Sequence, residues 1–303
     1  MRILVSNDDG IYSPGLAVLA RAAAEFGEVR VVAPDIERSS AGHSITSTHP
    51  LTYRPTTVAG LSAYRVNGTP ADCVALGMYH WEHVDVVLSG LNIGLNLGNA
   101  VWHSGTVAAA KQATLLGARG IALSAPASQE ADFAAYAPWL RRVLQTLLIE
   151  APPVRLVSVN LPRQPRGMMW TNASIEAYDG RIVPARDPMN REVYWFTVTP
   201  LEAAEKHTDR WAVEQHWISL TPIELDVTDR SELDRLRRAD PLDQEAADAM
   251  SPVVSSPDEA ASVRADEAHT AAAPGMPDVE GRHRATEAPP TSGSLLPTSG
   301  RQE

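Results

Sequence analysis

A single cysteine, Cys73, occurs in the 303-residue sequence, so no disulfide can form within the chain. The sequence also lacks an apolar segment long enough to cross a bilayer. Its first apolar run, which begins at Ile3, is interrupted by Asn7-Asp8-Asp9 and is too short for a signal peptide. We therefore expect a protein of a reducing compartment, located in the cytoplasm and without a membrane partner.

An excess of basic charge is also absent. The formal net charge is −11, but residues 239–303 alone hold 12 acidic residues and 4 arginines. Residues 1–238 hold 25 acidic and 22 basic residues and are nearly neutral. Binding to long nucleic acids depends on clustered Lys and Arg, so we expect no long nucleic acid as a partner. A small anion held by a few local groups remains compatible with this charge.

Residues 239–303 contain no Phe, Trp or Tyr and are rich in Pro, Ala, Ser and acidic side chains. Such a segment buries too little apolar surface to offset the conformational entropy of the chain. We predict a disordered tail over residues 239–303.

What the sequence does contain is a regular alternation of strands and helices in its first half. An apolar strand near the start, a helix beginning at Pro14 and a second strand over residues 29–33 form a βαβ unit, which requires a parallel sheet. A helix start follows at Thr69, with Pro70 as its first residue. Further strands are predicted over residues 84–88, 120–124 and 156–160. The sequence therefore predicts an α/β fold, and we assign residues 1–161 to its core.

The pattern changes after Pro162. Residues 193–198 and 217–221 have the composition of long strands, and no helix is expected between them. We predict that residues 162–238 form a β-rich extension that serves as an arm for self-association, ending in a short helix over residues 231–238.

The first strand ends directly in two adjacent carboxylates, Asp8 and Asp9, followed by Gly10. Like charges at one point repel unless a cation lies between them, and a hard divalent metal is the obvious cation. Asn, Asp and Gly are also ordinary turn residues, so a simple turn or helix cap remains the alternative.

Three further polar segments follow predicted elements of the sheet. They are a small polar loop around Ser39, a run of alternating glycines and asparagines at residues 89–99, and Ser104-Gly105-Thr106 at the start of an alanine-rich helix. A helix N-terminus presents unpaired N–H groups and suits a phosphate, although capping alone would explain Ser or Thr here. Ligands bind at the carboxyl edge of an open α/β sheet, so these segments favour one shared site.

Five ordered blocks of the sequence together resemble the SurE family of stationary-phase survival nucleotidases. They are Ser-Asn-Asp-Asp-Gly at residues 6–10, Ala-Pro-Asp at 33–35, Asn-Gly-Thr-Pro-Ala-Asp-Cys-Val at 67–74, Ser-Gly-Leu-Asn-Ile-Gly-Leu-Asn-Leu-Gly at 89–98 and His-Ser-Gly-Thr-Val at 103–107. The resemblance implies a Rossmann-like core with a doubly wound, mostly parallel sheet and a C-terminal β-rich extension. It also implies homodimers or homotetramers and metal-dependent removal of phosphate from nucleoside 5′- and 3′-monophosphates, which makes the chain a 5′-nucleotidase.

The same resemblance assigns roles to residues. It implies one divalent cation per subunit, Mg²⁺ or Mn²⁺, held by Asp8, Asp9, Ser39 and Asn92, and a phosphate site at Asn96, Ser104, Gly105 and Thr106. Carboxylate, hydroxyl and amide oxygens are hard ligands that suit both metals. The sequence departs from the family pattern at Asn99 and Ala100, where acidic residues are usual, and at His216, where glycine is frequent.

Several mechanistic alternatives stay open at this point. Asp8 or Asp9 is expected to orient or deprotonate a water molecule, or to attack the phosphorus directly, and His103 is a possible proton donor. One rival reading is a phosphorylated signalling receiver, but such a protein needs a lysine after its last strand, and none follows Ser124 at a suitable place. A second rival binds nucleotide with metal and does not turn it over.

Overall fold

The computed structural model describes residues 1–126, 130–174, 180–198 and 204–239. The chain divides into two compact units, Met1–Thr228 and Asp229–Glu303. Within the second unit the structure describes one helix, α7 (Arg230–Ala239), whose first turn is capped by the Asp229 carboxylate at 2.9 Å from the Glu232 nitrogen. The helix expected at residues 231–238 is thus confirmed, whereas the predicted disorder of the tail concerns residues outside the described part.

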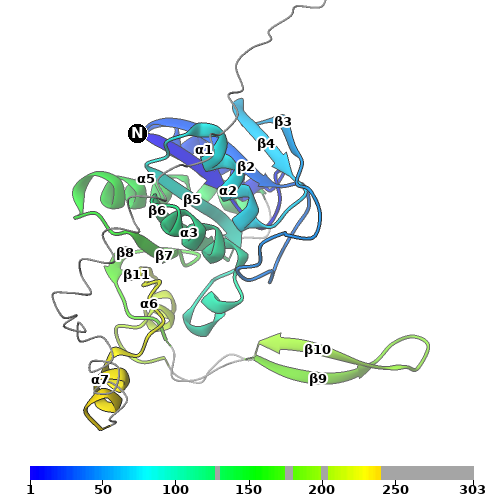
Figure 1. The fold of residues 1–303 in the computed structure, drawn as a ribbon, viewed down its shortest axis with the longest axis vertical. Helices are drawn as coiled ribbons and strands as arrows, with labels where there is room; N and C mark the ends of the chain where they lie inside the picture. The colour runs from blue at the N-terminus through cyan, green and yellow to red at the C-terminus, as the bar shows by residue number, and fades with distance from the viewer. Residues whose placement is uncertain (127–129, 175–179, 199–203, 240–303) are drawn as a thin grey trace, which may run out of the picture. The chain divides into compact units, whose positions relative to one another are not determined.

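Nine described strands of the first unit form one mixed sheet in the order β3-β4-β2-β1-β5-β6-β7-β11-β8 (Figure 1). The pairs from β4 to β7 are all parallel, while β3 and β11 run antiparallel to β4 and β7. The strands are β1 (Arg2–Ser6), β2 (Glu28–Pro34), β3 (Tyr53–Val58), β4 (Leu61–Val66), β5 (Val86–Ile93), β6 (Arg119–Ala125), β7 (Leu156–Asn160), β8 (Gly167–Trp170) and β11 (Trp217–Pro222).

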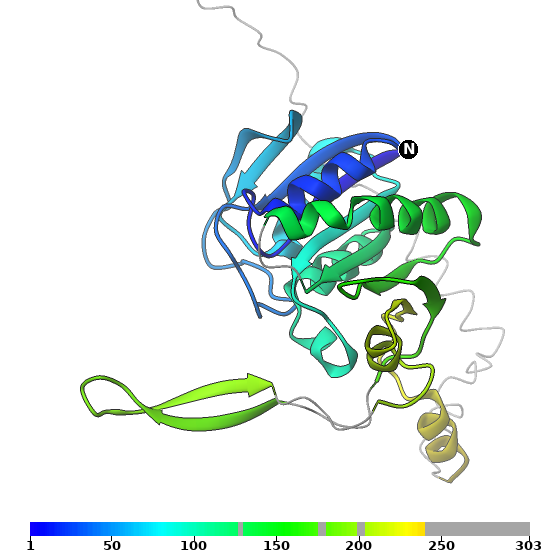
Figure 2. The ribbon, with the colours of Figure 1, turned by 180° about the vertical axis from the view of Figure 1, so that it is seen from behind.

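Helices cover both faces of this sheet, as the two opposite views show (Figures 1 and 2). One face packs against α1 (Pro14–Ala23), α4 (Glu130–Ala135) and α5 (Ala137–Gln145), which continues into a π-helical turn at Thr146–Glu150. The other face packs against α2 (Pro70–Trp81) and α3 (Gly105–Leu115). Strands buried on both faces explain the continuous apolar runs in the sequence. The prediction of a doubly wound, mostly parallel α/β sheet is confirmed.

The start of α2 shows how closely local sequence determines local structure. The Thr69 hydroxyl accepts a hydrogen bond from the Asp72 nitrogen at 3.1 Å, and the Asp72 carboxylate accepts one from the Thr69 nitrogen at 2.9 Å. This capping box satisfies two N–H groups that the helix itself leaves unpaired. Cys73 lies fully buried in the same helix, in accordance with its prediction as a core residue.

The direction of winding reverses between β1 and β5. From β1 the chain passes through α1 to β2 on one side, and it later enters β5 on the other side of β1, with Ser6 opposite Ser89. The loops that leave two such strands diverge and open a crevice at their carboxyl ends. Asp8 and Asp9 therefore emerge beside Asn92, although more than eighty residues separate them in the sequence.

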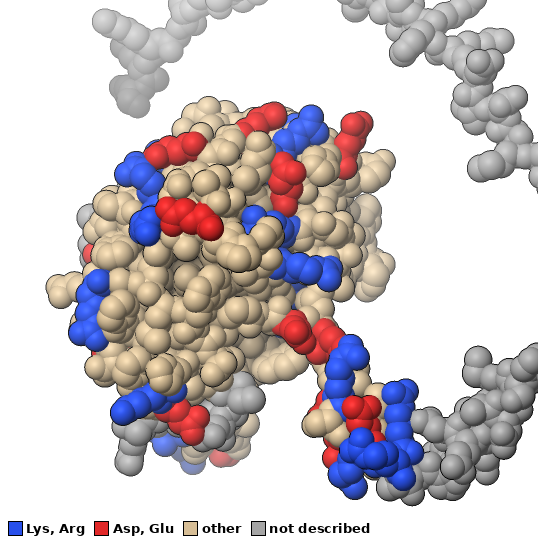
Figure 3. Space-filling view, turned by 90° about the vertical axis from the view of Figure 1, so that its left-hand side faces the viewer, with Lys and Arg blue, Asp and Glu red and all other residues tan. Residues whose placement is uncertain are grey.

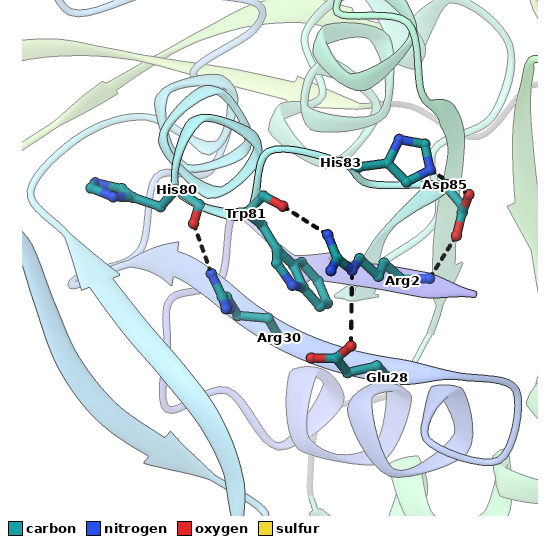
Figure 4. A network of polar contacts seen from close by, with 7 residues as sticks. All are labelled: Arg2, Glu28, Arg30, His80, Trp81, His83 and Asp85. Atoms are coloured by element: carbon teal, nitrogen blue, oxygen red, sulfur yellow. Dashed lines mark hydrogen bonds and ion pairs between the residues drawn. The ribbon is translucent and has the colours of Figure 1, made fainter.

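The amino-terminal edge of the same strands is closed by polar contacts (Figure 4). The Arg2 and Arg30 guanidinium groups donate to the Trp81 and His80 carbonyls, each at 3.2 Å, and so satisfy the C-terminal end of α2. Arg30 also lies over the Trp81 ring, 4.6 Å from its centroid. We assign this network a structural role, because helix carbonyls and a stacked ring already use its cations.

Beyond residue 161 the main sheet continues through β11 and β8, while β9 (Gly180–Arg186) and β10 (Glu192–Val198) form a separate antiparallel hairpin. The expectation of no helix between residues 198 and 217 was wrong. A short helix, α6 (Asp209–Glu214), begins at Thr208, whose hydroxyl accepts from the Trp211 nitrogen at 3.3 Å. One and a half turns are too short to show helical periodicity in a sequence. The predicted domain boundary at residue 161 stays a prediction.

No described helix combines the length and the apolar character that crossing a membrane requires.

Candidate functional site

A pocket of about 610 Å³ opens at the carboxyl ends of β1 and β5. Its volume falls in the range of small-molecule sites. Four segments supply its walls: the end of β1, the loop after β2, the loop and 3₁₀ turn (Gly98–Trp102) between β5 and α3, and strand β10 of the hairpin. The lining residues are Asp8, Ser39, Ser40, Asn92, Ile93, Gly94, Leu95, Asn96, Ala100, His103, Ser104 and Phe196.

Asp8 is the most deeply set carboxylate of the pocket, with 4% of its surface exposed. Its Oδ1 accepts a 2.6 Å hydrogen bond from the Thr106 hydroxyl, and its carbonyl accepts a 2.7 Å bond from the Arg38 nitrogen. The neighbouring Asp9 is half-buried, and its Oδ2 accepts from the Ile93 nitrogen at 3.2 Å. The acidic pair is thus fixed from three sides by segments distant in the sequence.

Burial raises the pKa of both carboxyl groups. For Asp8 the hydrogen bond from Thr106 opposes the effect of burial but does not cancel it. For Asp9 burial and then the charge of Asp8 raise the pKa to about 7, against the opposing hydrogen bond from the Ile93 nitrogen. Two such carboxylates ionise together only at a cost in free energy, which a bound cation would remove.

The donor atoms around this pair suit a hard divalent cation. The Asn92 amide nitrogen donates to the Gly94 carbonyl at 2.9 Å, so its Oδ1 is the atom left for a ligand. Ser39 is exposed, and its hydroxyl donates to the Glu37 carboxylate at 2.7 Å. The lone pairs of the Ser39 hydroxyl oxygen therefore remain available to a cation. Among the described residues no cluster of three or more His, Cys, Asp or Glu side chains could hold a metal. A cation here therefore needs the neutral oxygens as well as the two carboxylates, as Mg²⁺ and Mn²⁺ accept.

Asn96 is held by two residues that the sequence analysis did not single out. Its side-chain nitrogen donates to the Ser124 hydroxyl at 2.8 Å. The fully buried Asn160 pairs with the Asn96 backbone twice, accepting from its nitrogen at 2.8 Å and donating to its carbonyl at 3.1 Å. Ser124 and Asn160 end neighbouring strands β6 and β7, so the sheet positions the loop that lines the pocket. The signal in the sequence that could have indicated these two residues is their polar character at the ends of predicted strands.

Helix α3 brings its N-terminus to the pocket because it packs unusually close to the sheet. A Cβ on Gly120 of β6 would lie 2.1 Å from the Ala110 carbonyl, and a Cβ on Gly105 would lie 2.9 Å from Asp8 Cβ and Oδ2. Only glycine fits these two approaches. Ser104 caps the helix by accepting from the Val107 nitrogen at 3.0 Å and also lines the pocket. The capping role predicted as an alternative is therefore present, and it leaves the pocket at the positive end of the helix dipole.

The eight predicted site residues fall into two groups. Five of them line the pocket: Asp8, Ser39, Asn92, Asn96 and Ser104. The other three contact residues of the pocket. Asp9 accepts a hydrogen bond from the Ile93 nitrogen, Gly105 packs against Asp8, and the fully buried Thr106 donates a hydrogen bond to Asp8. Their roles as metal or phosphate ligands stay predictions. His103 also lines the pocket, whereas Phe196 was not anticipated.

A buried aspartate outside the pocket connects its outer loop to the C-terminal segment. Asp209, at the start of α6, accepts from the Gly98 nitrogen at 2.7 Å and from the Ser174 nitrogen at 3.0 Å. Burial raises the pKa of Asp209, and these backbone hydrogen bonds oppose the increase. Gly98 has a φ of +52°, and a Cβ there would lie 2.0 Å from the Ser174 carbonyl. Asp209 thus fastens the 3₁₀ turn of the pocket to the residue that precedes the hairpin segment.

Fold and pocket together define a doubly wound α/β protein with an oxygen-lined pocket at the switch point of its sheet. The family described as "Survival protein SurE" matches residues 3–180. The chain is 44% identical over 242 residues to "5′-nucleotidase SurE 1" of Thermus thermophilus, which spans 78% of this chain and 96% of the relative. It is 41% identical over 249 residues to "5′-nucleotidase SurE" of Deinococcus radiodurans, with 79% and 93% covered.

A solved structure is similar as well. The crystal structure of the SurE protein from Aquifex aeolicus superposes with a TM-score of 0.68 and 35% identity, covering 79% of this chain and 99% of that one. The chain belongs to the SurE family.

Proposed function

We propose that this chain is a metal-dependent phosphomonoesterase, a 5′-nucleotidase that hydrolyses nucleoside 5′-monophosphates and also 3′-monophosphates to nucleoside and phosphate. Membership of the SurE family and the names of the curated relatives support the reaction class. The observation that carries the proposal is the juxtaposition of the Asp8–Asp9 pair with the N-terminus of α3. The same end of the pocket is suited both to a cation and to the phosphate that the cation would share.

Asp8, Asp9, Asn92 and Ser39 would hold the cation, which we propose to be one Mg²⁺ or Mn²⁺ per subunit. A cation bound there would supply Lewis-acid polarisation of a phosphoryl oxygen and a coordinated water of lowered pKa. The hydrogen bond from Thr106 orients Asp8 and leaves its carboxylate no freedom to rotate out of the pocket. Burial raises the pKa of Asp9 to about 7 in the absence of a cation, and a cation bound there would lower this pKa and favour the ionised carboxylate.

The N-terminus of α3 acts on the phosphate. The positive end of its helix dipole stabilises the negative charge that develops on the transferring group. Asn96, held by Ser124 and Asn160, supplies a fixed amide to the same pocket. His103 lies on the same wall as Ser104, where a protonated ring would donate to the leaving alkoxide.

We also propose a cytoplasmic location and no long nucleic acid as a partner. Cys73 is buried and unpaired, as expected in a reducing compartment. On the face drawn in Figure 3, basic and acidic side chains alternate over the body of the protein and form no continuous basic area. Such a surface lacks the clustered cations that long nucleic acids require.

The β9–β10 hairpin supports the proposal of a homodimer or homotetramer. In the described part of the chain these strands pair only with each other, yet Ile182, Tyr194, Trp195 and Phe196 are each about two-thirds exposed. An isolated hairpin with apolar side chains is marginally stable in water, so a second copy of the chain would cover it. Light scattering is expected to give a multiple of the 32.7 kDa chain mass, reduced by Ile182→Asp. A monomeric wild type would contradict the proposal.

The function is tested by phosphate release from a panel of nucleoside 5′- and 3′-monophosphates in EDTA, Mg²⁺ or Mn²⁺. We expect release with either metal and none above background in EDTA, because the carboxylates of Asp8 and Asp9 repel a dianionic phosphate unless a cation lies between them. A folded protein that binds nucleotide with metal but releases no phosphate would instead favour the rival of a binding protein without turnover.

A further inference from the structure

The pocket has a buried polar end and an outer end that includes two large apolar side chains. Asp8, Asn92, Asn96 and Ser104 are buried to at least nine-tenths, and together they form the polar end. Toward solvent the walls carry two large apolar side chains, Ile93, 48% exposed, and Phe196, 64% exposed. The polar Ser39, Ser40 and His103 are also exposed there, and Leu95 and Ala100 are intermediate in exposure. A free phosphate would occupy only the polar end. The pocket therefore fits a ligand whose charged group is joined to a flat or apolar group.

Phe196 is the one Phe, Tyr or Trp side chain among the residues that line this pocket. It lies on β10 opposite Ile182 of β9, and its ring meets the His103 ring at a centroid distance of 6.5 Å and an interplanar angle of 67°. Side chains alternate along a strand, so the equally exposed neighbour Trp195 points to the other face of the hairpin. Of the two adjacent aromatic rings, only that of Phe196 is directed to the pocket.

We propose that Phe196 is a specificity-determining residue that stacks on the base of a nucleoside monophosphate whose phosphate lies at the polar end. The proposal rests on the phosphomonoesterase function and adds the part of the substrate that the hairpin recognises. A phenyl ring stacks on any base, because every base presents a π-face. It therefore favours nucleotides over sugar phosphates, and purines over pyrimidines through their larger ring area.

The test compares two substrates that differ only in the base. Adenosine 5′-monophosphate and ribose 5-phosphate carry the same phosphate and the same sugar, so their ratio of kcat/KM isolates the contribution of the base. In the full-length protein with Mn²⁺ we expect Phe196→Ala to lower this ratio about tenfold, chiefly through a higher KM for the nucleotide, because the stacking contact with the base is lost. Phe196→Tyr retains a ring and is expected to restore the ratio.

Trp195→Ala is the matched control, because it removes an equally exposed ring from the same strand on the opposite face. It is expected to leave the ratio unchanged, even if loss of assembly lowers the rates on both substrates together. If Phe196→Ala also left this ratio unchanged, because both substrates were affected equally or neither was affected, the proposal would be overturned.

A wild type without activity on either substrate would refute the phosphomonoesterase function and leave the base contact testable by binding. Titration calorimetry with adenosine 5′-monophosphate and ribose 5-phosphate would then give the same comparison. Weaker binding of the nucleotide alone to Phe196→Ala would support the stacking role, and equal binding to the two proteins would contradict it.

Discussion

Asp8→Asn and Asp9→Asn are each expected to reduce metal-dependent phosphate release by about 10³-fold or more, because each removes one of the two carboxylates that we propose as charged metal ligands. Asparagine keeps the size of the side chain, and in Asp8→Asn its oxygen still accepts from Thr106. Phosphate release at saturating Mn²⁺, with the metal affinity measured separately, checks the result. Glu25→Gln, on the distant surface pair with Arg141, is the control and is expected to leave the rate unchanged.

The same variants are expected not to destabilise the metal-free protein. The folded-state pKa of Asp9, about 7, lies above its ordinary value, so the folded form holds a proton that the unfolded form has released between about pH 4 and 7. The wild type therefore loses stability as pH rises through this interval, and Asp9→Asn does not. In melting curves recorded in EDTA, the melting temperature of Asp9→Asn relative to that of the wild type should increase up to about pH 7. The difference should then stay constant at higher pH. A variant that unfolds at lower temperature at pH 8 would show that the carboxylate stabilises the fold.

Asp209→Ala is expected to be the most destabilising substitution outside the sheet. It would leave the buried Gly98 nitrogen and the partly buried nitrogens of Ser174 and Arg210 without their acceptor, at a cost of about 3 kcal/mol in the free energy of unfolding. For a domain of this size the melting temperature would fall by roughly 10 °C. Because Gly98 begins the 3₁₀ turn that lines the pocket, KM for phosphomonoesters should rise as well.

Asp209→Asn provides an intermediate, since it retains one acceptor oxygen. Asp187→Ala is the matched control: Asp187 also accepts from two backbone nitrogens, those of Met189 and Arg191 at 2.9 Å, but only within the turn of the hairpin. It is expected to change the melting temperature little. Equal losses for Asp187→Ala and Asp209→Ala would mean that the connection between Gly98 and Ser174 contributes nothing to stability beyond the local hydrogen bonds.

Much of this protein could be predicted from short stretches of its sequence. The apolar strand that ends at Asp8, the Thr69 capping box and the alanine-rich helix after Ser104 all depend on neighbours within a few residues. Their order predicts a parallel α/β sheet, and the rule that ligands bind at its carboxyl edge predicts the location of the pocket. The five blocks of motif residues predict the family, which the comparisons confirm.

Other features of the protein could not be predicted from the periodicity of the sequence. The short α6 was missed, as were the roles of Asn160 and Ser124. Both residues contact Asn96, from which they are separated by 64 and 28 residues, respectively. The contact of Thr106 with Asp8 spans 98 residues, and that of Asp209 with Gly98 spans 111. No local propensity reports such pairs, because their proximity is created by the order of strands in the sheet.

By itself, the sequence determined the strands, the helix caps, the polar residues at the strand ends and the uneven distribution of charge, since these properties depend on composition and on neighbouring residues. Only the tertiary structure decided which polar groups meet. Sheet order placed the end of β1 beside the end of β5, two close approaches at Gly105 and Gly120 brought the α3 N-terminus to Asp8, and the β9–β10 hairpin directed Phe196 and not Trp195 toward the pocket. The physical reason is that packing and long-range hydrogen bonds, which depend on the whole fold, select one arrangement among the many that local preferences allow.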